Sequence, residues 1–360
     1  MDILWFNWRD IRNPEAGGAE VYTHEIAKRL AKKGHSITLF TSKFRNCEKE
    51  EVIDGIRVVR EGGKYTVYQK AKRFYKRNCS KFDVVIDEIN TKPFHTPKFV
   101  DKGKIVALIH QLAREFWFYE TPFPLDLIGY YLLEKRWLKN YVDLPTITVS
   151  NSTKEDLESL GFRKTYIVHN GLNVNLVNKD SEKADKPVVI FVGRMKKAKK
   201  PQDAIKAFEI VKREIKDAEL WMVGDGYLRK KLKSKAEKGV RFFGYVDWKI
   251  KDELVKKAWV IAVPGVREGW GQVVTDANAL GTPAVGYNVP GLRDSIRDGY
   301  NGLLVDTHPE ALADAIIRIL TDNKLREKLS RNAIEWAKQF SWDRSAEEFE
   351  RVIEEVVQQS

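Results

Sequence analysis

Short runs of β-branched and aromatic residues alternate with longer segments of helical periodicity along all 360 residues. The predicted strands are residues 3–8, 36–42, 56–61, 83–88, 104–111, 146–151, 165–170, 188–194, 219–225, 240–246, 259–265, 282–288 and 302–306. Residues 19–34 carry apolar side chains at helical spacing and end at Gly34, and a second helical pattern opens at Pro201. This alternation is typical of parallel sheets with helices on both faces.

The number of strands exceeds what one such sheet usually holds, so we expect two domains. The segment 173–187 is polar and aperiodic and ends in Pro, which is typical of a linker. We predict an α/β fold of two facing Rossmann-like domains, 1–178 and 179–340, with a C-terminal helix at about 341–360 packing back on the first. Ligands of such sheets bind at the carboxyl ends of the strands, here in an interdomain cleft. A (β/α)₈ barrel is the alternative, and the polar break argues against it.

The charge balance restricts the partners. There are 63 Lys and Arg against 51 Asp and Glu, a net charge of +12, so we expect a negatively charged partner: nucleic acid, an anionic membrane surface or a phosphorylated small molecule. No helix-turn-helix, RNP, zinc-finger or KH signature supports nucleic acid. Cys47 and Cys79 are too few for a disulfide framework or a Cys-rich zinc site. No signal-peptide pattern and no long apolar run occur, so we expect a cytoplasmic protein without a spanning helix.

Three glycine-containing segments follow predicted strands. In the first, residues 13–20, Gly17 and Gly18 open a helix whose free N–H groups could face an anion. In the second, residues 193–200, Arg194 and several lysines stand at a strand end, which suits a diphosphate. The alternatives are a tight turn that binds nothing and a solvated basic loop.

The third segment, residues 268–281, has glycines that free the backbone near a helix start. Gln272 and Asp276 are four residues apart and share a helix face. Acidic groups beside a phosphate-binding turn make sense for a ligand that also carries hydroxyl groups, because carboxylates accept hydrogen bonds from sugars. The alternative is a capping acid and a surface acid.

The order and spacing of the motifs from Asn13 to Trp342 resemble the family 4 glycosyltransferases. The motifs are GGAE (17–20), IHQ (109–111), VSNSTKEDL (149–157), HNGLN (169–173), FVGRMKKAKKPQDAI (191–205), VGDG (223–226), FFGYV (242–246), EGWGQVVTDANALGTPAV (268–285), DGYNGLLVD (298–306) and FSW (340–342). The resemblance implies the GT-B fold, a nucleotide-diphospho-sugar donor, retention of anomeric configuration and no metal or other cofactor.

The resemblance also implies roles for single residues. Arg194 and Lys199 match the pair that holds the donor diphosphate, and Lys200 stands where the family usually has Gly. Glu268 matches the first acid of the E-x7-E motif, which contacts the donor sugar. Asp276 stands in place of the second Glu, which contacts the ribose. The remaining matches are Gly271, Gln272 and Val273 in the turn beside phosphate and sugar, His110 near the donor sugar, and Gly244 and Tyr245 beside the nucleobase.

The segment 64–81 carries many cations and no acid. On a helix its apolar side chains, Val67, Tyr68, Ala71, Phe74, Tyr75 and Cys79, would form one face. That face either packs on the core, leaving a solvated basic face, or docks on anionic lipid. A second aromatic stretch, 116–140, could shape the acceptor pocket or join a membrane contact.

We therefore expect a retaining hexosyltransferase that uses a UDP- or GDP-linked sugar and a glycan or lipid-linked acceptor, in the cytoplasm or at the cytoplasmic face of a membrane. No nucleophile–acid pair is evident, which favours attack by the acceptor on the leaving-group face. A non-catalytic nucleotide-sugar-binding protein and a basic nucleic-acid-binding protein are the alternatives.

Overall fold

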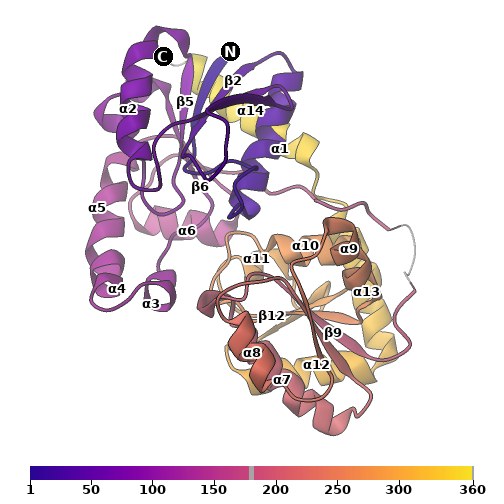
Figure 1. Cartoon of the computed structure of the whole chain (residues 1–360). Coiled ribbons are helices and arrows are strands. Elements are labelled where there is room, and N and C mark those ends of the chain that lie inside the picture. Colours follow the sequence, from indigo (N-terminus) through magenta and orange to yellow (C-terminus); the bar gives the residue numbers. More distant parts are fainter. Residues whose placement is uncertain (178–181, 359–360) are drawn as a thin grey trace. The chain divides into compact units, whose positions relative to one another are not determined.

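The computed structural model describes residues 1–177 and 182–358. It contains two compact units (Figure 1). Unit 1 comprises Met1–Trp117, Phe123–Gly171 and Phe340–Ser360, and unit 2 comprises Phe118–Pro122 and Leu172–Gln339. The predicted boundary between residues 178 and 179 lies outside the described residues.

An eight-stranded sheet forms the centre of unit 1, in the order β3-β4-β2-β1-β5-β6-β7-β8. Its strands are β1 (Asp2–Phe6), β2 (Ser36–Thr41), β3 (Glu50–Ile53), β4 (Ile56–Arg60), β5 (Val84–Glu88), β6 (Ile105–Ile109), β7 (Thr146–Thr148) and β8 (Thr165–Ile167). All neighbours are parallel except β3 and β4. The strand β3 was not predicted, because a short edge strand with two glutamates has no apolar run. The Asp54-Gly55 pair that joins it to β4 has positive φ at both residues, as a tight hairpin requires.

Helices cover both faces of this sheet, as predicted from the strand–helix alternation. They are α1 (Gly18–Lys32), α2 (Val67–Asn78), α4 (Leu125–Ile128), α5 (Glu134–Leu138), α6 (Asn151–Ser159) and α14 (Trp342–Gln358), with short 3₁₀ turns at Cys79–Lys81, Thr96–Lys98, Lys102–Lys104 and Lys139–Tyr141 and a π-helical turn at Gly129–Leu133. The short helix α3 (Phe116–Glu120) lies where the chain passes between the two units.

The apolar face of α2 packs into the core of unit 1. Val67, Ala71, Phe74 and Tyr75 are buried there. The expectation that Cys79 shares this face is wrong: the helix ends at Asn78, and the thiol lies exposed in the following 3₁₀ turn. The face that could have docked on lipid is therefore inside the protein, and α2 presents only its basic side to solvent.

The C-terminal helix α14 belongs to unit 1 and lies beside α1 (Figure 1). The ring of Phe349 stacks on the buried ring of Trp5 at 5.1 Å. Gly171 approaches Trp342 so closely that a Cβ would lie 2.2 Å from the Trp342 backbone nitrogen. These contacts make the last helix part of the core of unit 1.

Unit 2 has a six-stranded, wholly parallel sheet in the order β11-β10-β9-β12-β13-β14. Its strands are β9 (Val188–Val192), β10 (Glu219–Val223), β11 (Val240–Gly244), β12 (Val260–Val263), β13 (Ala284–Tyr287) and β14 (Gly302–Val305), and its helices are α7 (Pro201–Glu214), α8 (Arg229–Lys235), α9 (Trp248–Lys257), α10 (Gln272–Ala279), α11 (Leu292–Ser295), α12 (Pro309–Thr321) and α13 (Asn323–Ala337). This is the strand order of dinucleotide-binding domains, and the order reverses between β9 and β12.

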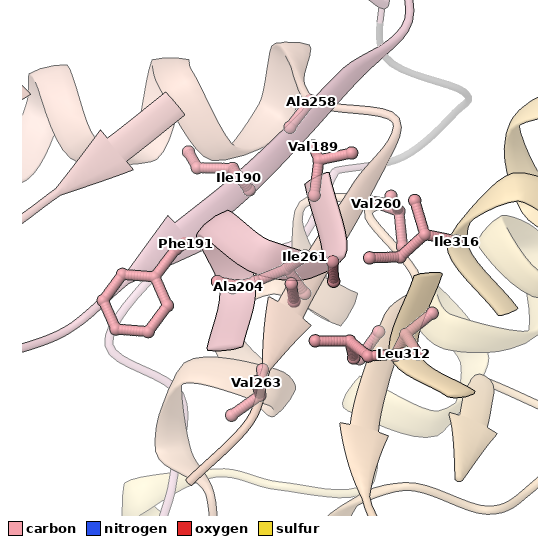
Figure 2. Close-up of a cluster of buried hydrophobic side chains, with 14 of the residues drawn as sticks. Val189, Ile190, Phe191, Ala204, Ala258, Val260, Ile261, Val263, Leu312 and Ile316 are labelled. Carbon is pink, nitrogen blue, oxygen red and sulfur yellow. The ribbon is translucent and has the colours of Figure 1, made fainter. Parts of the chain in front are cut away.

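The core of unit 2 lies between this sheet and its helices. Figure 2 shows side chains of the two central strands, such as Ile190 and Ile261, together with Leu312 and Ile316 of α12. All four are 0–1% exposed. Apolar packing on both faces therefore fixes β9 and β12, whose carboxyl ends form the switch point.

A cluster of charged side chains ties α14 to α1. Glu350 accepts from Lys33 Nζ at 2.5 Å and contacts His35 Nε2 at 2.7 Å. Burial raises the pKa of the Glu350 carboxyl, but the hydrogen bonds and charges of Lys33 and His35 outweigh it, so the pKa is lowered. A carboxyl with a depressed pKa stabilises the fold above its unfolded-state pKa, and this contribution disappears as the pH falls through the folded value.

We predict that Glu350→Gln lowers the free energy of unfolding by about 1 kcal/mol at pH 7. The difference from the wild type should shrink as the pH falls below the unfolded-state pKa of Glu350 and vanish below its lowered folded-state pKa. Chemical denaturation at several pH values measures it. The matched control is Glu354→Gln on the exposed side of the same helix, which should change little. An equal loss in both variants, or a loss independent of pH, would contradict the role of the cluster.

Candidate anion site of unit 2 and polar cluster of unit 1

The loop after β9 is held by the loop after β10. A Cβ on Gly224 would lie 2.1 Å from the Gly193 carbonyl oxygen, and one on Gly226 would lie 2.5 Å from the Met195 oxygen. Both glycines have φ in the region that disfavours side chains, +121° and +157°. The Met195 N–H also donates to the Asp225 oxygen at 2.8 Å. The VGDG motif is thus the support of the basic loop 193–200.

Two predicted diphosphate ligands differ in their surroundings. The Arg194 side chain is exposed and makes no hydrogen bond or ion pair within the described ranges. Lys199 instead donates to both carboxylate oxygens of Glu268, at 2.5 and 2.6 Å. Glu268 is mostly buried, with 13% of its side chain exposed. The pair fixes the ammonium group at the carboxyl ends of β9 and β12, while Arg194 remains available to a ligand.

Lys200 takes up the left-handed conformation, with φ of +45° and ψ of +48°. This conformation explains why the family usually has Gly at the position, since Gly adopts it without steric cost. The Lys200 ammonium lies 3.3 Å from Asp203 Oδ2 and over the ring of Tyr287. Its charge is therefore paired with Asp203 and adds little to the diphosphate site.

The helix α10 begins after Gly271, as predicted. Gly271 has φ of +84° and caps the helix, and a Cβ there would lie 2.6 Å from Ser295 Oγ. The backbone of Gln272 and Val273 forms the first turn, where unsatisfied N–H groups and the helix dipole favour an anion. The turn follows β12 at the same switch point as Arg194.

Asp276 lies one turn further along α10 and is buried. Its Oδ1 accepts from the Asn173 N–H at 3.0 Å and from Gln272 Nε2 at 2.8 Å, and its Oδ2 accepts from Asn173 Nδ2 at 3.2 Å. Burial raises the pKa of this carboxyl. Asn173, to which the sequence analysis gave no role, is thus the direct partner of Asp276, and the HNGLN motif is its signal in the sequence.

The edge strand β11 ends at Gly244, and Tyr245 follows it. A Cβ on Gly244 would lie 2.8 Å from Arg229 Nη2, and φ there is +73°. Tyr245 is 89% exposed, and Trp248 nearby in the chain is 60% exposed. Exposed aromatic rings beside a close-packed backbone turn could stack on a base. The sequence analysis did not single out Trp248.

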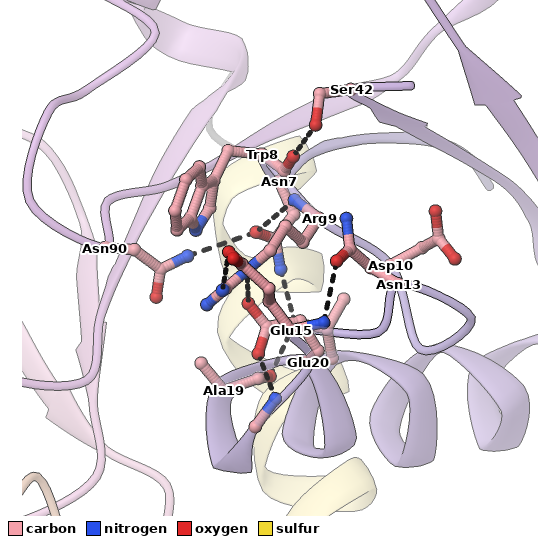
Figure 3. A network of polar contacts seen from close by, with 12 residues as sticks. Asn7, Trp8, Arg9, Asp10, Asn13, Glu15, Ala19, Glu20, Ser42 and Asn90 are labelled. Atoms are coloured by element: carbon pink, nitrogen blue, oxygen red, sulfur yellow. Dashed lines mark hydrogen bonds and ion pairs between the residues drawn. The ribbon is translucent and has the colours of Figure 1, made fainter. Parts of the chain in front are cut away.

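In unit 1, the helix start at Gly17 and Gly18 already holds a carboxylate. Glu20 accepts from the Gly17 N–H at 2.6 Å and from Arg9 Nε at 2.9 Å, and it is almost fully buried. Figure 3 shows Arg9 between Glu15 and Glu20. The space beside Gly18 is open, because a Cβ there would meet nothing within 4 Å.

His110 follows β6 and contacts the buried carboxylate of Glu88 at the end of β5. Its Nε2 lies 3.1 Å from Glu88 Oε1, while Glu88 Oε2 accepts from Trp5 Nε1 at 2.8 Å and from Thr23 Oγ1 at 2.5 Å. A carboxylate only accepts, so Nε2 carries the proton of this contact. Nδ1 of His110 is left to accept from a ligand. Glu88 is an addition to the site residues expected from the sequence, because its contact with His110 joins the ends of two different strands.

The predicted residues thus fall into two groups. Unit 2 brings together Arg194, Lys199, Glu268 and the α10 N-terminus around one strand-order switch point, an arrangement suited to a phosphate ester that also carries hydroxyl groups. Unit 1 holds His110 and the Gly17–Gly18 turn at the carboxyl ends of its own central strands. Within residues 1–177 and 182–358 there is no group of three or more metal-ligating side chains, and no helix long and apolar enough to cross a membrane.

Two family models match the chain, one in each half. Residues 16–176 match the model described as Glycosyltransferase Family 4, and residues 175–336 match that of Glycosyl transferases group 1. An uncharacterized glycosyltransferase of Methanocaldococcus jannaschii is 27% identical over 92% of this chain and 93% of that protein.

Solved structures share the fold. Sucrose-phosphate synthase from Thermosynechococcus elongatus superposes with a TM-score of 0.80 at 20% identity, covering the whole of both chains. The Anabaena protein HepE in complex with UDP and glucose has a TM-score of 0.73 at 17% identity, over 99% of this chain and all of that one. The predicted fold class, that of the GT-B glycosyltransferases, is confirmed.

We predict that Glu88→Gln changes the protonated nitrogen of His110. The new amide oxygen would keep the Trp5 and Thr23 donors, so its NH₂ group would face Nε2 and require a lone pair there. The imidazole proton should move to Nδ1, and the free energy of unfolding should fall by about 1–2 kcal/mol. Nitrogen chemical shifts of the ring at pH 8 report the tautomer.

The control is Asp54→Asn, which removes the carboxylate partner of His24 at 2.8 Å on the surface. It should shift the His24 signals and leave those of His110 unchanged. An unaltered His110 tautomer in Glu88→Gln would show that Glu88 does not set it.

Proposed function

The chain belongs to the family 4 glycosyltransferases, and we propose that it transfers a hexose, with retention of anomeric configuration, from a UDP- or GDP-linked donor to a glycan or lipid-linked acceptor. The observation that carries the proposal is the switch-point site of unit 2. There an unpaired Arg194 stands near the Lys199–Glu268 pair and the start of α10.

The chemical demand of the reaction matches this site. As the bond between the anomeric carbon and the diphosphate breaks, negative charge grows on the leaving oxygen and the sugar becomes oxocarbenium-like. Arg194 can hold two phosphate oxygens with its planar fork, and Lys199 supplies a point charge. Groups that are in place before the reaction stabilise such charge without reorganising. We assign charge compensation to these residues, so turnover should persist in EDTA.

Glu268 fits a role in holding the donor rather than in attacking it. Both of its oxygens accept from Lys199, so the carboxylate is committed to the ammonium and retains lone pairs for a sugar hydroxyl. We propose that the acceptor hydroxyl attacks on the face that the diphosphate leaves. Its proton passes to the departing phosphate oxygen, the new glycosidic bond replaces the broken one, and no protein nucleophile is needed.

The base of the donor is proposed to lie against Gly244 and Tyr245. HepE, which shares the fold, binds UDP, and this favours UDP over GDP as the first donor to try. Exposed Tyr245 and Trp248 offer flat surfaces for stacking. Asp276 is proposed to reach a ribose hydroxyl with the lone pairs that Asn173 and Gln272 leave open.

We predict that UDP or GDP raises the Tm of the wild type, because a ligand of the native state stabilises it. Arg194→Ala should abolish the shift and lower turnover about a hundredfold, without unfolding, since the side chain is exposed. Lys197→Ala removes an exposed cation from the same loop and is the matched control, with turnover near that of the wild type.

Several outcomes would contradict this proposal. Full activity of Arg194→Ala would refute the diphosphate assignment, and a product of inverted configuration by NMR would refute retention. A covalent sugar trapped on Glu268 would refute front-face attack. Nucleotide binding without turnover on any acceptor would instead favour a nucleotide-sugar-binding protein.

We further propose that unit 1 contacts an anionic membrane surface at the cytoplasmic face. Because the apolar face of α2 is buried, the segment 64–81 contributes through exposed cations, Lys72 on the helix and Lys64 and Lys81 on either side of it. Apolar contact with the membrane would come from residues 123–132. Their exposed side chains are Phe123, Leu125, Leu127, Ile128, Tyr131 and Leu132, which are 38–77% exposed. In the view of Figure 1, α2, α5 and α4 follow the left edge of unit 1.

We predict that the protein co-sediments with phosphatidylglycerol vesicles at low salt and much less with phosphatidylcholine. Replacing Lys64, Lys72 and Lys81 by Gln should weaken binding about fivefold per charge. Replacing Lys231, Lys233 and Lys235 in and around α8 of unit 2 by Gln removes the same charge and is the control. Absence of binding to anionic vesicles by the wild type would end the proposal.

A further inference from the structure

A pocket of about 920 Å³ lies in unit 1, and none of the residues assigned to glycosyl transfer lines it. It is lined by Lys43, Lys49, Glu61, Gly62, Gly63, Lys70, Arg73, Lys76 and Arg77. The cations of α2 thus meet two lysines from the segment between β2 and β3. Basic residues that look like a solvated helix face in the sequence line one side of an open pocket in the fold.

Most cations of the pocket have no carboxylate partner among the described residues. In the described part of the chain, Lys43, Lys49, Lys70, Arg73 and Lys76 make no ion pair. The one acid of the lining, Glu61, lies 3.9 Å from Arg77, which is 64% exposed. Like charges gathered around one cavity create a positive potential that an anion would relieve.

The walls of the pocket are fixed by buried contacts. Arg60 is fully buried and donates to both oxygens of Asp10, at 2.7 and 3.0 Å, and to the Glu48 carbonyl at 3.1 Å. The Lys43 N–H donates to the Gly62 oxygen at 2.7 Å. Gly62 has φ of +77°, and a Cβ there would lie 2.9 Å from the Val67 nitrogen. Residues 43–49 and 61–63 are therefore held beside α2 without a ligand.

The lining also restricts the chemistry of the ligand. It contains no aromatic ring on which a base could stack and no apolar side chain that would hold an acyl chain. Arg and Lys together suit phosphate, through bidentate and point-charge contacts respectively. We propose that this pocket binds the phosphate group of a phosphate ester or diphosphate, as a second anion site besides the loop 193–200. The proposal does not rest on glycosyl transfer, because all lining residues lie in unit 1.

The test is calorimetric titration with pyrophosphate at low salt. The wild type should bind at two sites. Lys70→Gln with Arg73→Gln should weaken the pocket site about a hundredfold, roughly tenfold for each charged partner removed. Arg194→Ala should instead lose only the site in unit 2. The two sites are lost in different variants. A wrong assignment of the donor site in unit 2 can therefore be told apart from a wrong assignment of the pocket in unit 1.

The matched control is Lys102→Gln with Lys164→Gln, which removes the same charge from exposed positions of unit 1 outside the lining. It should keep both sites. Without ligand, the pocket variant should melt at the same or a higher temperature than the wild type at low salt, because repulsion is relieved. Unchanged pyrophosphate binding in the pocket variant, or an equal loss in the control, would overturn the proposal.

Competition identifies the source of the phosphate. Phosphatidic acid vesicles that displace pyrophosphate from the pocket, where phosphatidylcholine vesicles do not, would support a lipid headgroup. Displacement by glycerol 3-phosphate but not by the vesicles would support a soluble ester. A single-stranded oligonucleotide that binds more tightly than pyrophosphate, and that the same variant no longer binds, would overturn the proposal in favour of nucleic acid.

Discussion

The close approach of two backbone loops in unit 2 is the constraint on which the candidate site depends. Gly224 and Gly226 leave no room for a side chain against residues 193–195, so the loop after β9 is seated on the loop after β10. The parallel sheet places this contact between the two loops beside the end of β12, where the strand order reverses. Only then can Lys199 meet Glu268 and Arg194 extend outward. A charged group aimed at a ligand must be positioned by contacts that do not themselves need the ligand.

Unit 1 uses buried carboxylates for the same purpose. Glu88 accepts hydrogen bonds from side chains of β1, of α1 and of the residue after β6, and Glu20 accepts one from the backbone at the start of α1. Each is almost fully buried, where an unpaired charge would be costly, so their hydrogen bonds fix the neighbouring side chains in one arrangement. His110 is thereby presented with a defined nitrogen toward its surroundings.

Much of this architecture could be predicted from local sequence. The buried parallel strands are continuous apolar runs, and glycines and cations directly after them mark the switch-point loops. The misses have physical causes. β3 is a polar edge strand whose pairing depends on a distant neighbour, and Cys79 fell beyond a helix end that apolar spacing does not reveal. The pairing of Asp276 with Asn173 depends on a tertiary contact between residues far apart in the sequence, which no spacing rule contains.

The basic helix α2 shows why charge alone is an incomplete guide to function. From the sequence, its apolar face could pack on the core or on lipid, and the burial of Val67 and Phe74 shows that it packs on the core. Its cations could be a solvated surface or part of a binding site, and the helix alone does not distinguish the two. The outcome depends on residues 43–49 and 61–63, which approach α2 only because Arg60 and Gly62 hold them there. Elsewhere many cations, such as Lys33, Lys199 and Lys200, have carboxylate partners. Where the fold gathers cations around an open pocket and supplies a single weakly paired acid, an anion from outside the chain would relieve the repulsion among them.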